Sequence, residues 1–91
     1  MANLQLAVKG EYFDQMKAGV KKFEYRLQTD YWRKRLVNRD YEHLIITKGY
    51  PRADDLERRI DVPYCGYVEE SITHKHFGDA QVDVFAIIVN V

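Results

Sequence analysis

Apolar and polar side chains alternate with a period of two in three short stretches, residues 4–8, 22–27 and 59–69. This alternation is typical of strands that bury one face. Two further stretches, residues 44–47 and 85–89, are apolar at nearly every position, which indicates strands in the interior of a sheet. The pattern therefore predicts five or six strands.

Two other segments repeat their apolar residues with the spacing of a helix. Residues 11–18 form the first, and Gly19 follows at the position where helices commonly end. Thr29 offers an N-cap for a second helix over residues 31–37, in which Trp32 belongs to the apolar face. Strands combined with short helices predict an α+β fold.

Composition limits the size and setting of this fold. A chain of 91 residues supports one hydrophobic core, so we expect a single domain, residues 1–91. Fourteen basic residues balance fourteen acidic ones, so any binding of nucleic acid must rely on a local patch. No apolar run at the start resembles a signal peptide or a membrane span, so we expect a cytoplasmic protein without a membrane partner.

The strand predicted over residues 22–27 carries its charges at alternate positions. The even-numbered residues are charged, whereas the odd-numbered ones are Phe23, Tyr25 and Leu27. We expect the odd-numbered side chains to face the core and the charged ones to face outward. A charged strand face of this kind is a candidate for chemistry.

Lys21, Glu24 and Arg26 are the candidate catalytic residues. Two cations beside a carboxylate lower its pKa, and a lysine beside an arginine loses its proton more readily and serves as a base or nucleophile. Such a set would support hydrolysis. The alternative is a solvated strand face with an ion pair, which contributes little to stability.

Residues 31–35, Tyr-Trp-Arg-Lys-Arg, form a patch in which aromatic and basic side chains are interleaved. Nucleic-acid bases could stack on such rings while the cations bind phosphates. The alternative is an amphipathic helix that packs Trp32 into the core. Both readings can hold for different residues of the patch.

Other reactive residues give weaker signals. His74-x-His76 has a spacing that some metal sites use, with Asp79 or Asp83 as further ligands, but no thiolate cluster supports it, so we expect a surface turn and no metal. Cys65 precedes Gly66 in a predicted strand, and we expect it to be a small buried residue rather than a nucleophile. The chain also lacks a glycine-rich phosphate loop and a serine flanked by glycines.

The pattern Gly19-x-Lys21-x-x-Glu24-x-Arg26 after a short helix resembles the signature of the ASCH domain, a relative of the PUA RNA-binding fold. The resemblance covers most of the chain. It continues through Tyr31-Trp32, the strand ending at Gly49-Tyr50, Arg59, Tyr64-x-Gly66-Tyr67 and Val84-Phe85-Ala86-Ile87.

The resemblance implies a small PUA-like β-barrel of five to six strands flanked by two or three short helices, with the lysine, glutamate and arginine of the motif lining a cleft. Members of the family are proposed to bind RNA, and some branches are hydrolytic: one deacetylates N4-acetylcytidine and another is described as a ribonuclease. The deacetylating branch has a threonine nucleophile at the position of Glu24, and a carboxylate does not replace an alcohol in that role. That branch also uses a downstream glutamate, for which Glu69 and Glu70 are the candidates.

We therefore expect an RNA-binding or nucleotide-binding module without a cofactor. Lys21 and Arg26 would contact a phosphate or a base edge, Glu24 would accept hydrogen bonds from a base or orient Lys21, and Tyr25 or Tyr50 would stack on a base. Further contacts with RNA are expected from Tyr31, Arg33, Lys34 and Arg59.

Two alternatives remain open at this point. In the first, the chain is a small hydrolase of the same fold, a ribonuclease or a modified-nucleoside amidohydrolase, in which Lys21 and Glu24 activate water and Arg26 stabilises negative charge. In the second, it is a phage accessory module whose aromatic and arginine-rich helix docks on a host protein. The small size is similar to that of stand-alone ASCH proteins of bacteria and their phages.

Overall fold

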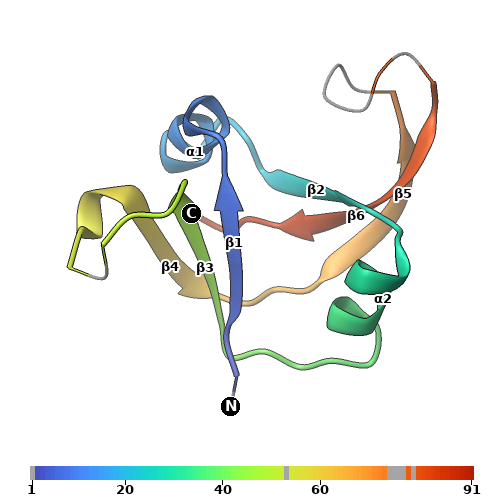
Figure 1. Cartoon of the computed structure of the whole chain (residues 1–91), viewed down its shortest axis with the longest axis horizontal. Coiled ribbons are helices and arrows are strands. Elements are labelled where there is room, and N and C mark those ends of the chain that lie inside the picture. Colours follow the sequence, from blue (N-terminus) through green and yellow to red (C-terminus); the bar gives the residue numbers. More distant parts are fainter. Residues whose placement is uncertain (1, 53, 74–77, 79) are drawn as a thin grey trace.

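The computed structural model describes residues 2–52, 54–73, 78 and 80–91. Within these residues it confirms the predicted α+β class, with six strands, two α-helices and one short 3-10 helix (Figure 1). The elements follow in the order β1 (Leu4–Val8), α1 (Gly10–Lys17), β2 (Phe23–Leu27), α2 (Asp30–Leu36), β3 (His43–Lys48), η1 (Leu56–Arg58), β4 (Arg59–Pro63), β5 (Tyr67–Ile72) and β6 (Val82–Ile88).

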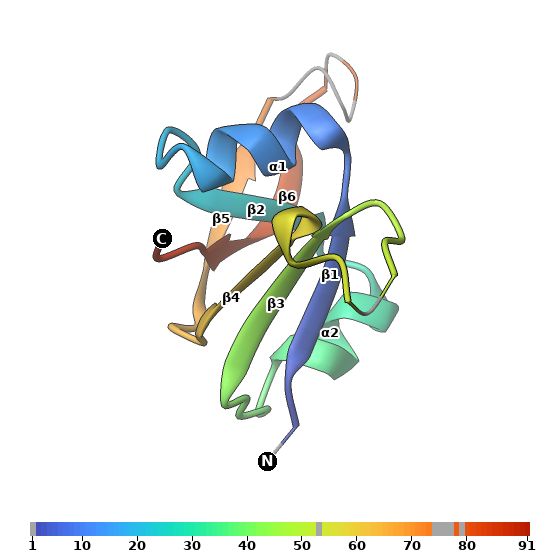
Figure 2. The ribbon, with the colours of Figure 1, turned by 90° about the vertical axis from the view of Figure 1, so that its left-hand side faces the viewer.

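The strands form two separate three-stranded sheets. In the first sheet, β3 lies between β1, which it pairs in parallel, and β4, which it pairs antiparallel. In the second, β6 lies between β2 and β5, and both pairings are antiparallel. Helix α2 lies on the side of β1 where the second sheet is also found (Figures 1 and 2). Among the described strands, β1 pairs only with β3, so its other edge is unpaired.

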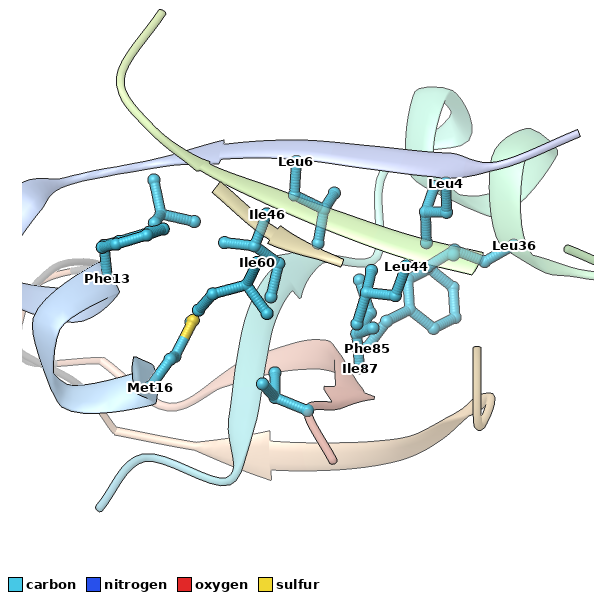
Figure 3. Packing of buried hydrophobic residues seen from close by; sticks show 12 residues of the cluster. Leu4, Leu6, Phe13, Met16, Leu36, Leu44, Ile46, Ile60, Phe85 and Ile87 are labelled. Carbon is cyan, nitrogen blue, oxygen red and sulfur yellow. The ribbon is translucent and has the colours of Figure 1, made fainter. Parts of the chain in front are cut away.

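A hydrophobic core fills the space between the two sheets. Strands β1, β3 and β6 contribute most of it, α1 adds Phe13 and Met16, and α2 adds Leu36 (Figure 3). The predicted interior position of residues 85–89 is confirmed, because Phe85, Ile87 and Val89 are all buried. Full burial of a side chain of this kind contributes about 1.5–3 kcal/mol. The core thus holds both sheets and both helices together.

The local signals that end or begin helices are confirmed as well. Gly19 adopts a φ of +78° directly after the last residues of α1. The Thr29 side chain caps α2 by accepting a hydrogen bond of 3.4 Å from the backbone N–H of Trp32. No helix among the described residues is long and apolar enough to cross a membrane.

The predicted orientation of β2 is wrong. Glu24 is only 4% exposed and faces the interior, whereas Leu27 is 37% exposed. The register explains the inversion, because Glu24 is opposite Ile87 and Arg26 is opposite Phe85, two core residues of β6. Since β6 is apolar on both faces, its sequence does not determine which face of β2 turns inward. The charged face of β2 therefore belongs to the inside of the molecule.

Cys65 also differs from its prediction. It is exposed, and it lies outside the strands, in the connection between β4 and β5. Pro63 ends β4 and Gly66 adopts a φ of +90°, so the chain turns away from the sheet at this point. The segment with His74 and His76 lies outside the described residues.

Candidate functional site

Arg26 joins the two sheets at the free edge of β1. Its Nη2 donates a hydrogen bond of 3.2 Å to the carbonyl oxygen of Ala7, and its Nη1 lies 3.1 Å from Oε2 of Glu24. The guanidinium carbon also lies 5.3 Å from the centroid of the Trp32 ring. A carbonyl, a carboxylate and an indole thus fix one guanidinium at the seam between β1 and β2.

Glu24 is the buried partner of this guanidinium. Oε1 accepts a hydrogen bond of 3.1 Å from the backbone N–H of Tyr25, while Oε2 contacts Arg26. Burial raises the pKa of Glu24, and the charges of Arg26 and Lys21 oppose this shift. Because both carboxylate oxygens are engaged and almost no surface is exposed, Glu24 positions Arg26 and is not accessible to a substrate in this conformation.

Lys21 lies in a different environment from Arg26. Its ammonium is 4.5 Å from the centroid of the Tyr25 ring and 5.4 Å from that of Tyr12. Tyr25 points to the face of β2 opposite to that of Glu24 and Arg26, since neighbouring side chains in a strand alternate. Burial lowers the pKa of Lys21, with a smaller lowering by Arg26, and the Glu24 charge opposes both effects.

Lys21 and Arg26 line two different cavities in the described part of the structure. Lys21 and Tyr25 line a cavity of about 380 Å³ that also includes residues of α1, whereas Arg26 lines another of about 490 Å³. Glu24 lines neither of them. Its effect on the pKa of Lys21 and its contact with Arg26 make it the electrostatic link between the two cavities.

The cavity at Arg26, here called the seam pocket, is rich in aromatic rings. Tyr31 and Tyr50 are 57% and 96% exposed, and Tyr31 meets the ring of Trp32 edge-on with centroids 5.1 Å apart. Its lining consists of Gln5, Leu6, Ala7, Arg26, Tyr31, Trp32, Thr47 and Tyr50. Three rings and one guanidinium thus surround one hollow, which is suited to a planar polar ligand.

Local structure explains how these side chains reach the same hollow. Tyr31 and Trp32 belong to the first turn of α2, which the Thr29 cap places directly after β2. Tyr50 follows Gly49, whose φ of +67° turns the chain at the end of β3. The parallel pairing of β1 with β3 sets Ala7 opposite Thr47 at the base of the pocket.

Sequence reasoning identified part of this set. The structure brings together Arg26, Tyr31 and Tyr50 of the predicted RNA-binding residues. Sequence reasoning missed Gln5, which is a polar position of the alternating first strand, and Thr47, the one hydroxyl of a nearly apolar strand. Both lie on the face of the first sheet opposite to the core residues Leu6 and Ile46 of the same strands.

The remaining predicted residues lie elsewhere. The Arg33 guanidinium carbon is 5.8 Å from the centroid of the Phe85 ring, and Lys34 lines a separate basic cavity. Arg59 is opposite Thr47 in the sheet, and its buried Nε has no hydrogen-bond partner among the described residues. In the same part of the chain, no group of three or more His, Cys, Asp or Glu residues is arranged to hold a metal ion.

Comparisons with known proteins find no relative of this chain. A scan against protein-family models finds no match, and searches of curated proteins and of solved structures find no significant similarity.

Proposed function

We propose that the seam pocket binds one nucleotide unit of RNA, or a nucleotide-like ligand, with the base against the rings and its polar edge toward Arg26. The observation that carries the proposal is the gathering of Tyr31, Trp32 and Tyr50 around the same hollow as Arg26. Stacking of a base on a protein ring contributes about 1–3 kcal/mol, because every base has a π-face.

Arg26 suits the edge of a base better than a phosphate. An arginine has five N–H donors in a rigid fork, and only its Nη1 and Nη2 make hydrogen bonds to described residues, to Glu24, Tyr25 and Ala7. N–H groups therefore remain for a ligand. Because the carboxylate of Glu24 already compensates the charge, Arg26 offers directed donors and little net positive charge.

The same arrangement favours binding over hydrolysis. A hydrolase would need Lys21 and Glu24 to act on one substrate, but Glu24 is buried and lines neither the cavity at Lys21 nor the one at Arg26. Lys21 and Tyr25 supply a second aromatic and basic surface on the other face of β2.

For the fold, we propose that the two sheets correspond to an open form of the PUA-like barrel that the ASCH resemblance implies. The support is the contact of Arg26 with Ala7, which links β2 to the unpaired edge of β1 where a barrel would close. The Gly19-x-Lys21-x-x-Glu24-x-Arg26 pattern is the basis of the resemblance.

Tyr50→Ala is the sharpest test of the binding proposal, because a side chain that is 96% exposed contributes little to folding. Binding of a fluorescently labelled single-stranded RNA should weaken by about 1–3 kcal/mol. Leu56→Ala is the matched control, since it truncates another exposed large side chain, 74% exposed, that does not line the seam pocket. Thermal unfolding should be unchanged in both variants.

Equal binding by Tyr50→Ala and Leu56→Ala, or no binding of RNA or nucleotide by the wild type, would refute the proposal. The same samples should be followed for cleavage of the RNA and for deacetylation of N4-acetylcytidine. Product formed by the wild type and lost in Glu24→Gln would favour the hydrolase instead.

A further inference from the structure

A basic hollow adjoins the seam pocket at Tyr31. This basic pocket has a volume of about 480 Å³ and is lined by Asp30, Tyr31, Lys34, Arg35, Arg39 and Tyr41. Three of its side chains are cationic and one is acidic, although the chain as a whole has no net charge. Since Tyr31 lines both pockets, a ligand that passes this ring would occupy both.

Two of the cations are held in place by contacts with residues of α2. The Arg35 guanidinium carbon lies 4.3 Å from the centroid of the Tyr31 ring, and Arg39 Nε donates a hydrogen bond of 3.1 Å to the carbonyl oxygen of Lys34. The Tyr41 hydroxyl donates to the carbonyl oxygen of Arg35. The ammonium of Lys34 has no ion pair with any described residue.

Helix stability accounts for only part of this arrangement. Cations near the C-terminal end of a helix interact favourably with its dipole, which explains basic residues in the last turn of α2. That effect does not require the side chains to surround a hollow, nor to share a ring with the seam pocket. The grouping of Lys34, Arg35 and Arg39 around the hollow points to an anionic ligand.

We propose that the basic pocket binds the phosphodiester backbone adjoining the nucleotide whose base occupies the seam pocket. The ligand is then a single-stranded polynucleotide rather than a free nucleotide. This inference rests on the proposed function of the seam pocket. It assigns separate tasks to two sites: the compensated Arg26 reads a base, and the uncompensated cations meet the phosphates.

Single-stranded ligands fit this division better than duplexes. A base that stacks on Tyr31, Trp32 or Tyr50 must leave its neighbours in the strand, which an unpaired strand does at low cost. The backbone then continues past Tyr31 into the basic pocket.

The test compares ligands that reach one pocket with ligands that reach both. Binding of each nucleoside 5′-monophosphate and of the corresponding tetranucleotide is measured on the full chain at 50 and 200 mM salt. The tetranucleotide should bind more tightly, and its advantage should shrink as salt rises, because phosphate contacts release counterions.

Lys34→Gln should weaken tetranucleotide binding about 3- to 5-fold at the lower salt, as expected for one exposed ionic contact. For a single strand, the loss of one phosphate contact lowers the slope of log affinity against log salt by about 0.7, so the affinity drop over a fourfold salt increase becomes about 2.6-fold smaller. Mononucleotide binding should be unchanged, because Lys34 does not line the seam pocket.

Arg33→Gln is the matched control, because it removes the same charge from the same helix at a residue outside the basic pocket. It should leave tetranucleotide binding close to that of the wild type. Thermal unfolding of both variants verifies that they fold.

Four results would overturn the inference. Equal binding of mononucleotide and tetranucleotide, or equal losses in Lys34→Gln and Arg33→Gln, would reject the backbone site while leaving the seam pocket intact. Displacement of the tetranucleotide by a polyglutamate peptide at equal concentration would assign the basic pocket to an acidic protein partner. Failure of every nucleotide and oligonucleotide to bind would reject the proposed function together with the inference.

Discussion

Replacing Arg26 by glutamine removes the cation that compensates the buried Glu24 carboxylate. The two groups lie 3.1 Å apart, and the Arg26 side chain is 21% exposed while that of Glu24 is 6% exposed. Removing one partner of a buried ion pair costs about 3–5 kcal/mol, and the partial exposure of Arg26 places this case near the lower end. The lost hydrogen bond to Ala7 adds about 0.5–1.5 kcal/mol. A domain of 91 residues has a total stability of roughly 5–14 kcal/mol, so this loss is a large fraction of it.

Glu24→Gln should behave differently. Burial raises the pKa of Glu24 in spite of the neighbouring cations, so folding shifts its titration toward the neutral form. A glutamine keeps the shape of that form, and its free energy of unfolding at pH 7 should be within about 1 kcal/mol of the wild type or higher. The double variant should be more stable than Arg26→Gln alone, because it contains no unpaired buried carboxylate.

The effect of pH on the stability of these variants has a definite sign. A carboxyl whose pKa is raised on folding stabilises the protein fully below its unfolded pKa, and this contribution is lost as pH rises through its folded pKa. In Arg26→Gln the pKa of Glu24 should rise further, because the Arg26 charge holds it down. The loss of stability in this variant should therefore be smaller at pH 5 than at pH 8. This difference between the two pH values should nearly vanish once Glu24 is also replaced.

Urea unfolding of the wild type, both single variants and the double variant at pH 5, 7 and 8 measures these differences. A loss in Glu24→Gln as large as that in Arg26→Gln at pH 7 would refute the reasoning, because it would mean that the ion pair outweighs the desolvation of the carboxylate.

Two further perturbations test other parts of the site. Glu24→Gln should lower the pKa of Lys21 below its already reduced value, because the negative charge of Glu24 opposes the lowering by burial. An NMR titration of the Lys21 ammonium measures the shift. An unchanged pKa would show that the two groups are not coupled. Gly19→Ala should destabilise the protein by about 1–2 kcal/mol, because a left-handed φ of +78° is unfavourable for alanine and no neighbouring atom lies within 4 Å to compensate or clash; urea unfolding with an unchanged midpoint would contradict this.

The sequence allowed the elements to be predicted because their signals are local. Alternation located β1 and β2, the apolar run located the buried part of β6, and Gly19 and Thr29 located a helix end and a helix start. Each of these signals acts within a few residues of its own position. The prediction that Cys65 is buried in a strand failed because the chain leaves the sheet after Pro63.

The orientation of β2 could not be predicted, because it depends on pairing between distant segments. Both faces of β6 are apolar, so either face of β2 would find apolar neighbours there. In the observed orientation, Arg26 reaches Ala7 on β1 and Glu24 on its own strand. A prediction based only on alternation places the charged side chains in solvent and therefore misses an internal ion pair.

The seam pocket depends on the same non-local contacts. Gln5, Tyr31 and Tyr50 come from three segments that are far apart in sequence, and they meet because β1 pairs with β3 while α2 lies beside β1 (Figure 2). The motif predicts a role for Arg26, and the aromatic patch predicts one for Tyr31, but neither signal indicates that the two residues share a pocket. Their meeting required the fold.

Burial of Glu24 gives Arg26 a property that an exposed arginine lacks. An exposed side chain of this length loses rotamer freedom when it binds, at a cost of about 0.5–1.5 kcal/mol. Arg26 is already fixed by Glu24, Ala7 and the Trp32 ring, so little of this cost remains for a ligand to overcome. The carboxylate also removes the excess charge that would draw phosphates to the same place. A buried pair that adds little to stability therefore produces a rigid, directional donor beside three rings, which is what recognition of a base edge requires.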